Sequence, residues 1–93
     1  MKFRKKPVVV EAIQWDGSWE RLHEIVKWAG HQKILFNLHY TDVNDVKIKT
    51  LEGTMPVSIG DWIIKGVKGE FYPIRNDIFE ATYEAAEVKD GTP

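Results

Sequence analysis

The chain has 93 residues, of which 43% are hydrophobic and 29% are charged, and it contains no cysteine. These values are ordinary for a globular protein and exclude a disordered chain, while the length leaves room for one hydrophobic core and not for two. A net charge of −1 removes the general attraction on which non-specific nucleic-acid binding relies. We therefore predict a single domain over residues 1–86, a flexible tail at 87–93, and no general affinity for nucleic acid.

No stretch of the sequence approaches the roughly twenty apolar residues of a membrane-spanning helix. The apolar run at residues 8–13 is interrupted by Glu11 and is followed by no cleavage pattern of an export signal. The expected location is therefore the cytoplasm, without membrane contact. Four basic residues gather near the start of the chain, at Lys2, Arg4, Lys5 and Lys6. We interpret this run as a solvated lead-in to the first strand, and a phosphate contact stays open as the alternative.

The first two elements follow from the apolar pattern of residues 8–30. Three valines followed by alternation over residues 8–15 predict a strand, in which Glu11 is expected at a rim or in a pair. Asp16 or Ser18 is expected to cap a helix, and Gly30 is expected to end it. Spacings of three and four predict the apolar stripe of this helix, formed by Trp19, Leu22, Ile25, Val26 and Ala29.

The middle of the chain predicts three strands. The first covers residues 33–40, and its inward side chains are expected to be Ile34, Phe36 and Leu38. A loop at residues 41–45 separates it from a strand at residues 46–50 with one wet face. The next strand returns over residues 54–59, where Pro56 lacks an N–H and therefore indicates the edge of a sheet.

The last third of the chain predicts a hairpin followed by short elements. Residues 62–65 and 70–74 are expected as strands, joined by a turn at residues 66–69 whose two glycines permit positive φ. A short helical turn is expected at residues 75–77. The alternation of residues 79–84 predicts a final short strand. The predicted fold class is α+β, with one N-terminal amphipathic helix packed on a twisted, mostly antiparallel sheet or a partly open small barrel.

Residue types that carry chemistry are present without a catalytic or metal-binding pattern. The three histidines, His23, His31 and His39, lack the spacing that would bring two ring nitrogens to one ion. Residues 42–45 lack the glycine and the distal glutamate of a calcium loop, and Asp61 is expected to close a turn. We therefore predict no catalytic residue, no metal and no cofactor.

One cluster in the last third of the sequence is suited to a ligand. Aromatic rings stack on bases and cations neutralise phosphates, so a nucleotide or a short single strand is a candidate ligand for a cluster of both kinds. The candidate ligand-binding residues are Trp62, Lys65, Lys68, Tyr72 and Arg75. The alternative interpretation is that the aromatics fill a small core and the cations lie on its wet face.

Four tryptophans are many for a chain of this length, and burying all of them completely is difficult. Trp28 falls beside the apolar stripe of the predicted helix instead of on it. If it reaches the surface together with Trp15 or Trp62, the resulting apolar patch would suit association with a partner or a second copy. Trp28 is therefore the candidate interface residue, and a homo-oligomer is an open expectation.

Two segments of the chain resemble a family of small proteins encoded by tailed bacteriophages and prophages. They are KFRKKPVVVEAIQW at residues 2–15, and GDWIIKGVKGEFYP at residues 60–73 followed by DIFEATYE at residues 77–84. The resemblance implies a phage or prophage origin and transfers no catalytic residue, because members of this family mostly carry no assigned activity. Similar proteins often read Tyr-Pro-Cys-Lys-Pro-Asp where this chain has isoleucine at position 74, so a function through that thiol is not open to it.

The resemblance favours a non-catalytic accessory protein that acts in the host cytoplasm. Small phage proteins of this kind commonly occlude a host protein or sequester a nucleotide signal used in defence, so a host protein and a small nucleotide are the expected partners. The first alternative is a small phosphodiesterase or nuclease that uses one of the histidines. The second alternative is a structural or assembly component that acts as an oligomer.

Overall fold

The structure is a computed structural model of the chain, and it describes residues 1–3, 8–39 and 42–85. The elements are β1 (Glu11–Gln14), α1 (Trp19–Ala29), β2 (Ile34–His39), β3 (Asp42–Thr50), β4 (Gly53–Pro56), β5 (Trp62–Lys65), β6 (Phe71–Ile74) and α2 (Asn76–Thr82). The predicted tail at residues 87–93 and most of the N-terminal basic run lie outside the described residues.

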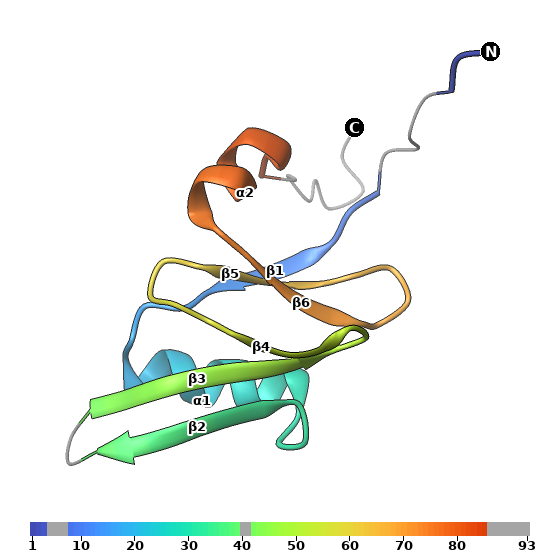
Figure 1. Cartoon of the computed structure of the whole chain (residues 1–93). Helices are drawn as coiled ribbons and strands as arrows, with labels where there is room; N and C mark the ends of the chain where they lie inside the picture. The colour runs from blue at the N-terminus through green and yellow to red at the C-terminus, as the bar shows by residue number, and fades with distance from the viewer. Residues whose placement is uncertain (4–7, 40–41, 86–93) are drawn as a thin grey trace, which may run out of the picture.

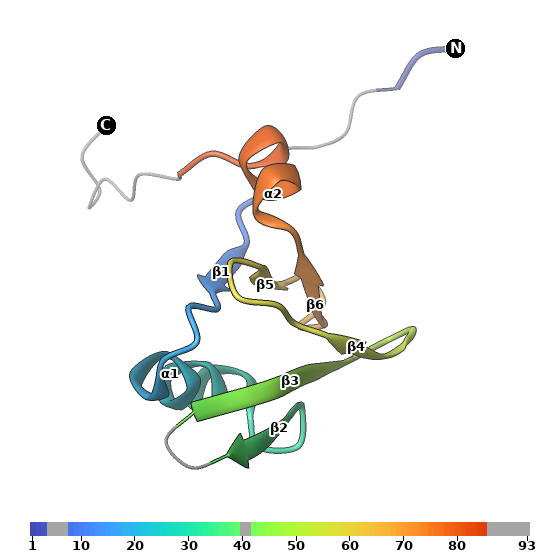
Figure 2. The ribbon, with the colours of Figure 1, turned by 60° about the vertical axis from the view of Figure 1, so that its left-hand side comes forward.

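The fold is mixed α+β, with two small antiparallel sheets that stay open instead of closing into a barrel. One sheet has the strand order β1-β5-β6 and the other has the order β2-β3-β4. The two sheets adjoin where β6 contacts β3 and β4. The sheet β1-β5-β6 lies in the middle of the molecule, with α2 at one end and α1 beside the second sheet at the other (Figures 1 and 2).

Helix α1 begins and ends where local chemistry requires it to. The Ser18 hydroxyl accepts a hydrogen bond from the Arg21 amide at 3.1 Å, and Gly30 ends the helix at φ 98°, a backbone conformation that glycine adopts without steric cost. Leu22 and Ile25 are buried, while Trp19, predicted on the apolar stripe, is exposed. Trp19 is the first residue of the helix, at the N-terminal end of the stripe.

The hydrophobic core joins α1 to both sheets. Its buried members are Trp15, Leu22, Ile25, Ile34, Val43, Val46, Ile48, Val57, Ile63 and Phe71. Each buried apolar side chain of this size contributes about 1.5 to 3 kcal/mol relative to exposure. Because residues from β3, β5 and β6 share this cluster with α1, the two sheets are held together by one core.

The prediction of a loop at residues 41–45 is wrong, because β3 already begins at Asp42. This part of β3 contains a bulge. The pairing register with β2 shifts by one residue between Leu35 and Asn37, and Asp45 has φ 53°. Aspartate tolerates this left-handed conformation better than most residues. The extra residue shifts the alternation, so that Val43 and Val46, an odd number of residues apart, are both buried.

Three further strand predictions differ in detail from the structure. Phe36, predicted inward, is 42% exposed, because β2 is an edge strand whose pairing shifts at this residue. The fourth predicted strand ends early, at Pro56, after which the Val57 amide donates to the Val46 carbonyl oxygen at 2.8 Å. The edge position that Pro56 predicts is confirmed, since β4 is the outer strand of its sheet. The first strand begins at Glu11 and not at residue 8.

The predicted final strand at residues 79–84 is wrong, because the chain forms helix α2 over most of this segment. The pattern fits both structures here, because Phe79 and Tyr83 are four residues apart. This spacing puts two side chains on the same face of a strand and also on the same face of a helix, about one turn apart. The Phe79 amide donates to the Arg75 carbonyl oxygen at 2.8 Å, and the Tyr83 amide donates to the Phe79 carbonyl oxygen at 2.8 Å. Among the described residues, neither α1 nor α2 is long and apolar enough to cross a membrane.

Candidate binding groove

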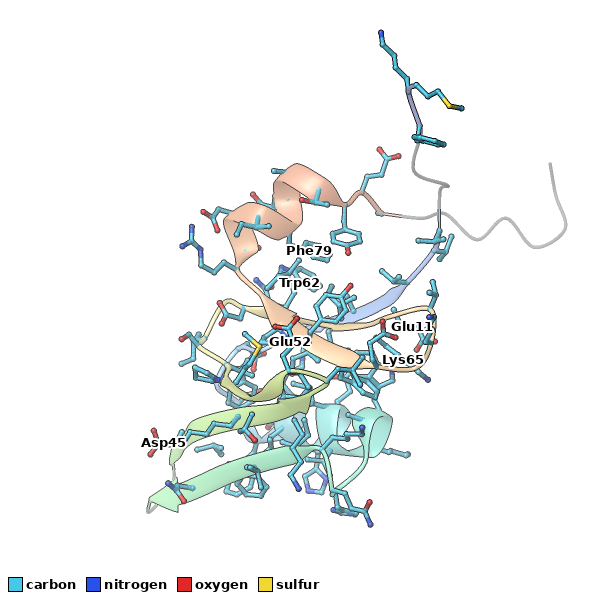
Figure 3. The ribbon with its side chains drawn as sticks, turned by 45° about the vertical axis from the view of Figure 1, so that its right-hand side comes forward. Glu11, Asp45, Glu52, Trp62, Lys65 and Phe79 are labelled. Atoms are coloured by element: carbon cyan, nitrogen blue, oxygen red, sulfur yellow. The ribbon has the colours of Figure 1, made fainter. Side chains whose placement is uncertain are left out.

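The predicted ligand-binding residues divide between the two faces of the sheet β1-β5-β6. Trp62 pairs with Ile74 and Ile64 pairs with Tyr72, so the side chains of Trp62 and Tyr72 share the face that α2 covers. Lys65 pairs with Phe71 on the opposite face, which packs on the core. Figure 3 shows Lys65 beside Glu11, at the far end of the sheet from Trp62.

The two remaining predicted cations lie at opposite ends of the β5–β6 hairpin. Lys68 is in the turn between the strands, and Arg75 follows the last residue of β6. A strand rises about 3.3 Å per residue, so the length of β6 separates the two. Arg75 is also engaged: its guanidinium donates to both carboxylate oxygens of Asp77, at 2.6 and 3.1 Å, which raises the pKa of Arg75 and lowers the pKa of Asp77. The cations do not converge on the rings.

The structure instead forms an open groove of about 800 Å³ between β1 and α2. We call it the α2 groove; it is lined by residues 8–10, Ala12, Trp62, Phe79, Glu80 and residues 82–85. Residues 8–10 and Ala12 come from β1 and the chain before it, Trp62 comes from β5, and the others come from α2 and the chain after it. The groove is therefore built from three segments that are far apart in the sequence.

Three stacked rings form the aromatic wall of the α2 groove. Trp62 and Phe79 stack with ring centroids 4.0 Å apart and planes 8° from parallel, and Phe79 and Tyr83 stack at 5.2 Å and 22°. Figure 3 shows Phe79 reaching down from α2 toward Trp62. Each such ring pair contributes about 0.5 to 1.5 kcal/mol of stability beyond the burial of its area. Because the rings stack on one another without a ligand, the wall is already formed in the free protein.

Asn76 holds Trp62 in place from the start of α2. Its side-chain oxygen accepts a hydrogen bond from Trp62 Nε1 at 2.9 Å and a longer one from Gln14 Nε2 at 3.4 Å. Its amide nitrogen donates to Glu80 Oε1 at 3.3 Å. One side chain therefore ties β1, β5 and α2 together beside the groove.

Tyr72 supports the end of the aromatic wall. Its hydroxyl lies 3.5 Å from the hydroxyl of Tyr83. Burial raises the pKa of Tyr72 to about 12, and the hydrogen bond to Tyr83 adds to the shift. The phenol of Tyr72 is therefore neutral at physiological pH and acts as a hydrogen-bonding contact, with no role for a phenolate.

Within the described part of the chain, the charged residues that line the groove are acidic. Glu80 and Glu84 are both exposed at its α2 side. Carboxylates at a partly apolar cleft create a negative potential, which attracts cationic side chains and repels phosphate groups. The charges of the described lining residues therefore oppose the nucleotide that the sequence cluster suggested.

The other candidate residues lie away from the groove. His23 and His31 are exposed on α1 and in the turn after it, and the side chain of His39 lies outside what the structure describes. Within the described residues, no group of three histidine, aspartate or glutamate side chains is placed to hold a metal ion. Asp61 closes a turn as predicted, because its carboxylate accepts the Ser58 amide at 2.9 Å.

Trp28, the candidate interface residue, is half-buried against the core. Its ring meets Phe71 edge-on, with centroids 5.1 Å apart, and its Nε1 donates to Glu11 Oε1 at 2.8 Å. The two expectations for Glu11 are thus met together, since this carboxylate is exposed and also paired. The role of Trp28 in an interface stays a prediction.

Of the residues that line the groove, the sequence interpretation named only Trp62 as a ligand-binding candidate; it missed the others, among them Phe79, Glu80, Tyr83 and Glu84. The sequence signal for the two rings is the four-residue separation of Phe79 and Tyr83, because in a helix this separation places both side chains on one face. The sequence places Asn76 only in a turn, and no local pattern indicates that it reaches Trp62. In comparisons with known proteins, no protein-family model, no curated protein and no solved structure matches the chain.

Proposed function

We propose that this chain is a phage- or prophage-encoded accessory protein that binds a segment of a host protein in the α2 groove and performs no chemistry. The observation that carries the proposal is the aromatic wall of the groove, in which Trp62, Phe79 and Tyr83 follow one another as stacked rings. The resemblance of residues 2–15, 60–73 and 77–84 to small tailed-phage proteins supports the origin, and with it the host cytoplasm as the location.

The groove favours an apolar anchor from the partner. A partner side chain buried against the aromatic wall would gain about 1.5 to 3 kcal/mol from the removal of apolar surface from water. Because Asn76 and the ring stacking already hold Trp62 and Phe79, little additional ordering of the protein is needed on binding.

The acidic rim favours cationic residues beside that anchor. Glu80 and Glu84 lie at the opening of the groove and are exposed, so their attraction acts mainly on the rate and specificity of association. The Debye length is about 10 Å at 0.1 M salt, and the attraction should therefore weaken as salt is added. A basic and apolar protein segment fits both features of the groove.

A nucleotide fits the same groove poorly. Its base could stack on the aromatic wall, but its phosphates would meet Glu80 and Glu84, while Lys65 lies on the other face of the sheet and Arg75 is paired with Asp77. Neither His23 nor His31 lines the groove, so the enzyme alternative gains no support from this site. Binding to a protein segment is the function that the arrangement supports best.

The test uses an acetylated heptapeptide, Lys-Thr-Val-Thr-Val-Thr-Lys, which in an extended conformation carries its lysines and valines on one face; its counterpart with glutamate in place of lysine and ATP are the comparisons, and each is titrated calorimetrically into the protein. We expect the basic peptide to bind, and we expect the double variant Glu80→Lys with Glu84→Lys to weaken its binding by about tenfold or more, which corresponds to about 1.4 kcal/mol. Tighter binding of ATP than of the basic peptide would contradict the proposal.

A matched control separates the groove from the overall charge of the protein. Glu20→Lys with Glu52→Lys makes the same change in net charge at two exposed carboxylates, neither of which lines the groove. This variant should keep its affinity for the basic peptide within about threefold. Equal losses in the two double variants would show that only net charge attracts the peptide.

A further inference from the structure

The free edge of β1 borders the α2 groove. β1 is an outer strand of the sheet β1-β5-β6, and within the described residues no strand pairs with its other side. The chain leading into it, residues 8–10, lines the same groove, and Val8 and Val9 are 54% and 78% exposed. An unpaired strand edge beside exposed valines offers backbone hydrogen bonds and apolar surface to the same partner.

The direction in which each residue of β1 points its backbone N–H and C=O groups determines which residues offer these hydrogen bonds. Trp15 bonds toward β5, because its amide donates to Asp61 and its carbonyl oxygen accepts from Gly60, at 2.9 and 2.8 Å. In an antiparallel ladder, the N–H and C=O groups of successive residues point to opposite edges of the strand. The backbone groups of Glu11 and Ile13 therefore also face β5, and those of Ala12 face the open edge.

The open edge is closed at its C-terminal end. The carbonyl oxygen of Gln14, which faces the same edge as Ala12, accepts a hydrogen bond from Arg21 Nη1 of α1 at 2.9 Å. The backbone of Ala12 and the chain before it are therefore the part of the edge that a partner can reach. Ala12 also lines the groove. A partner residue paired with Ala12 would therefore place its side chain on the groove face of the sheet.

We infer that the partner segment binds by strand addition: it lies in an extended conformation along β1, and its alternate side chains enter the α2 groove. This inference rests on the proposed function and adds the conformation and the chemistry of the partner. The partner segment is extended, basic and apolar, because its side chains on the groove face must meet both the aromatic wall and the carboxylates of Glu80 and Glu84.

A second copy of this chain is a weaker occupant of the edge. Antiparallel pairing of two β1 edges would bring two α2 grooves to the same face of the combined sheet. Glu80 and Glu84 of both copies would then add their negative charges on one surface, where like charges repel.

Backbone N-methylation of the basic heptapeptide tests the inference. One peptide is methylated on the amides of its threonines and the other on the amides of its lysines and valines, so each loses the donors of one edge only. Strand addition predicts that one methylated peptide binds at least about tenfold more weakly than the parent while the other stays within about threefold. Equal affinity of both for the protein would overturn strand addition and leave the proposed function standing.

A variant of the protein provides the reciprocal test. Ala12→Pro removes the outward N–H, and proline is tolerated at a position of an edge strand whose N–H faces solvent. We expect at least about a tenfold loss of affinity for the unmethylated peptide, with an unchanged circular dichroism spectrum. Failure of the unmethylated peptide to bind the wild-type protein would refute the proposed function itself. A dimer of the free protein that dissociates in Ala12→Pro, detected by sedimentation, would assign the edge to a second copy and overturn the inference.

Discussion

Asn76 shows how much of the groove depends on a single polar side chain. Its oxygen accepts from Trp62 and from Gln14, and its amide group donates to Glu80, so all three segments around it are oriented by one residue. Neutral hydrogen bonds of this kind contribute about 0.5 to 1.5 kcal/mol each. Asparagine suits this position because it combines an acceptor and two donors in one short side chain.

Tyr72 gives the stability of the protein a pH dependence in the alkaline range. Its pKa is about 12 in the folded protein and about 10 in an unfolded chain. The folded state therefore holds the proton more tightly, and the stabilisation is complete below about pH 10 and is lost as the pH rises through about 12. We expect the urea midpoint to fall between about pH 9 and about pH 11.

The variant Tyr72→Phe isolates this contribution, because other groups also titrate in the alkaline range. Its urea midpoint should fall less between the same two pH values than the midpoint of the wild-type protein. Equal falls in both proteins would mean that Tyr72 is not the group responsible.

Among the elements, α1 owes its start to one hydroxyl. Replacing Ser18 by alanine removes the acceptor for the Arg21 amide, and we expect it to lower the free energy of unfolding by about 1 kcal/mol, measured by urea denaturation. Ser58→Ala is the matched control, since Ser58 is exposed and its hydroxyl caps no helix. A similar loss in both variants would show that the cap is not the cause.

The elements α2 and β3 show why local patterns were insufficient in two places. Phe79, Ala81 and Tyr83 alternate as in a strand, yet the segment becomes a helix because the Phe79 ring then stacks on Trp62. In β3, the bulge at Asp45 lets Val43 and Val46 face the same core. Both outcomes depend on contacts with residues that are distant in the sequence.

On the scale of the whole molecule, one core that spans both sheets predicts a single cooperative unfolding transition. Tryptophan fluorescence, which reports on the core through Trp15 and on the groove through Trp62, should follow the same urea curve as circular dichroism. The variant Ile63→Ala, at a fully buried position of β5, should move both curves together by about 2 to 5 kcal/mol. Separate midpoints for the two signals would show that the sheets unfold independently.

Much of the framework follows from sequence alone. The span of α1, the hairpin formed by β5 and β6, the edge position of β4 and the turn closed by Asp61 are encoded by residues close together in the chain. Capping hydroxyls, glycines at positive φ and a proline without an N–H act within a few residues, so their effects can be recognised before the fold is known.

The groove, in contrast, was decided by the tertiary structure. Strand register placed Trp62 and Tyr72 on one face and Lys65 on the other, which separated rings and cations that are neighbours in the sequence. Helix α2 then brought Glu80 to the rings, and the charge of the site became negative where the sequence cluster is positive. The physical reason is that a strand sends adjacent side chains to opposite faces, so closeness along the chain does not determine closeness in space.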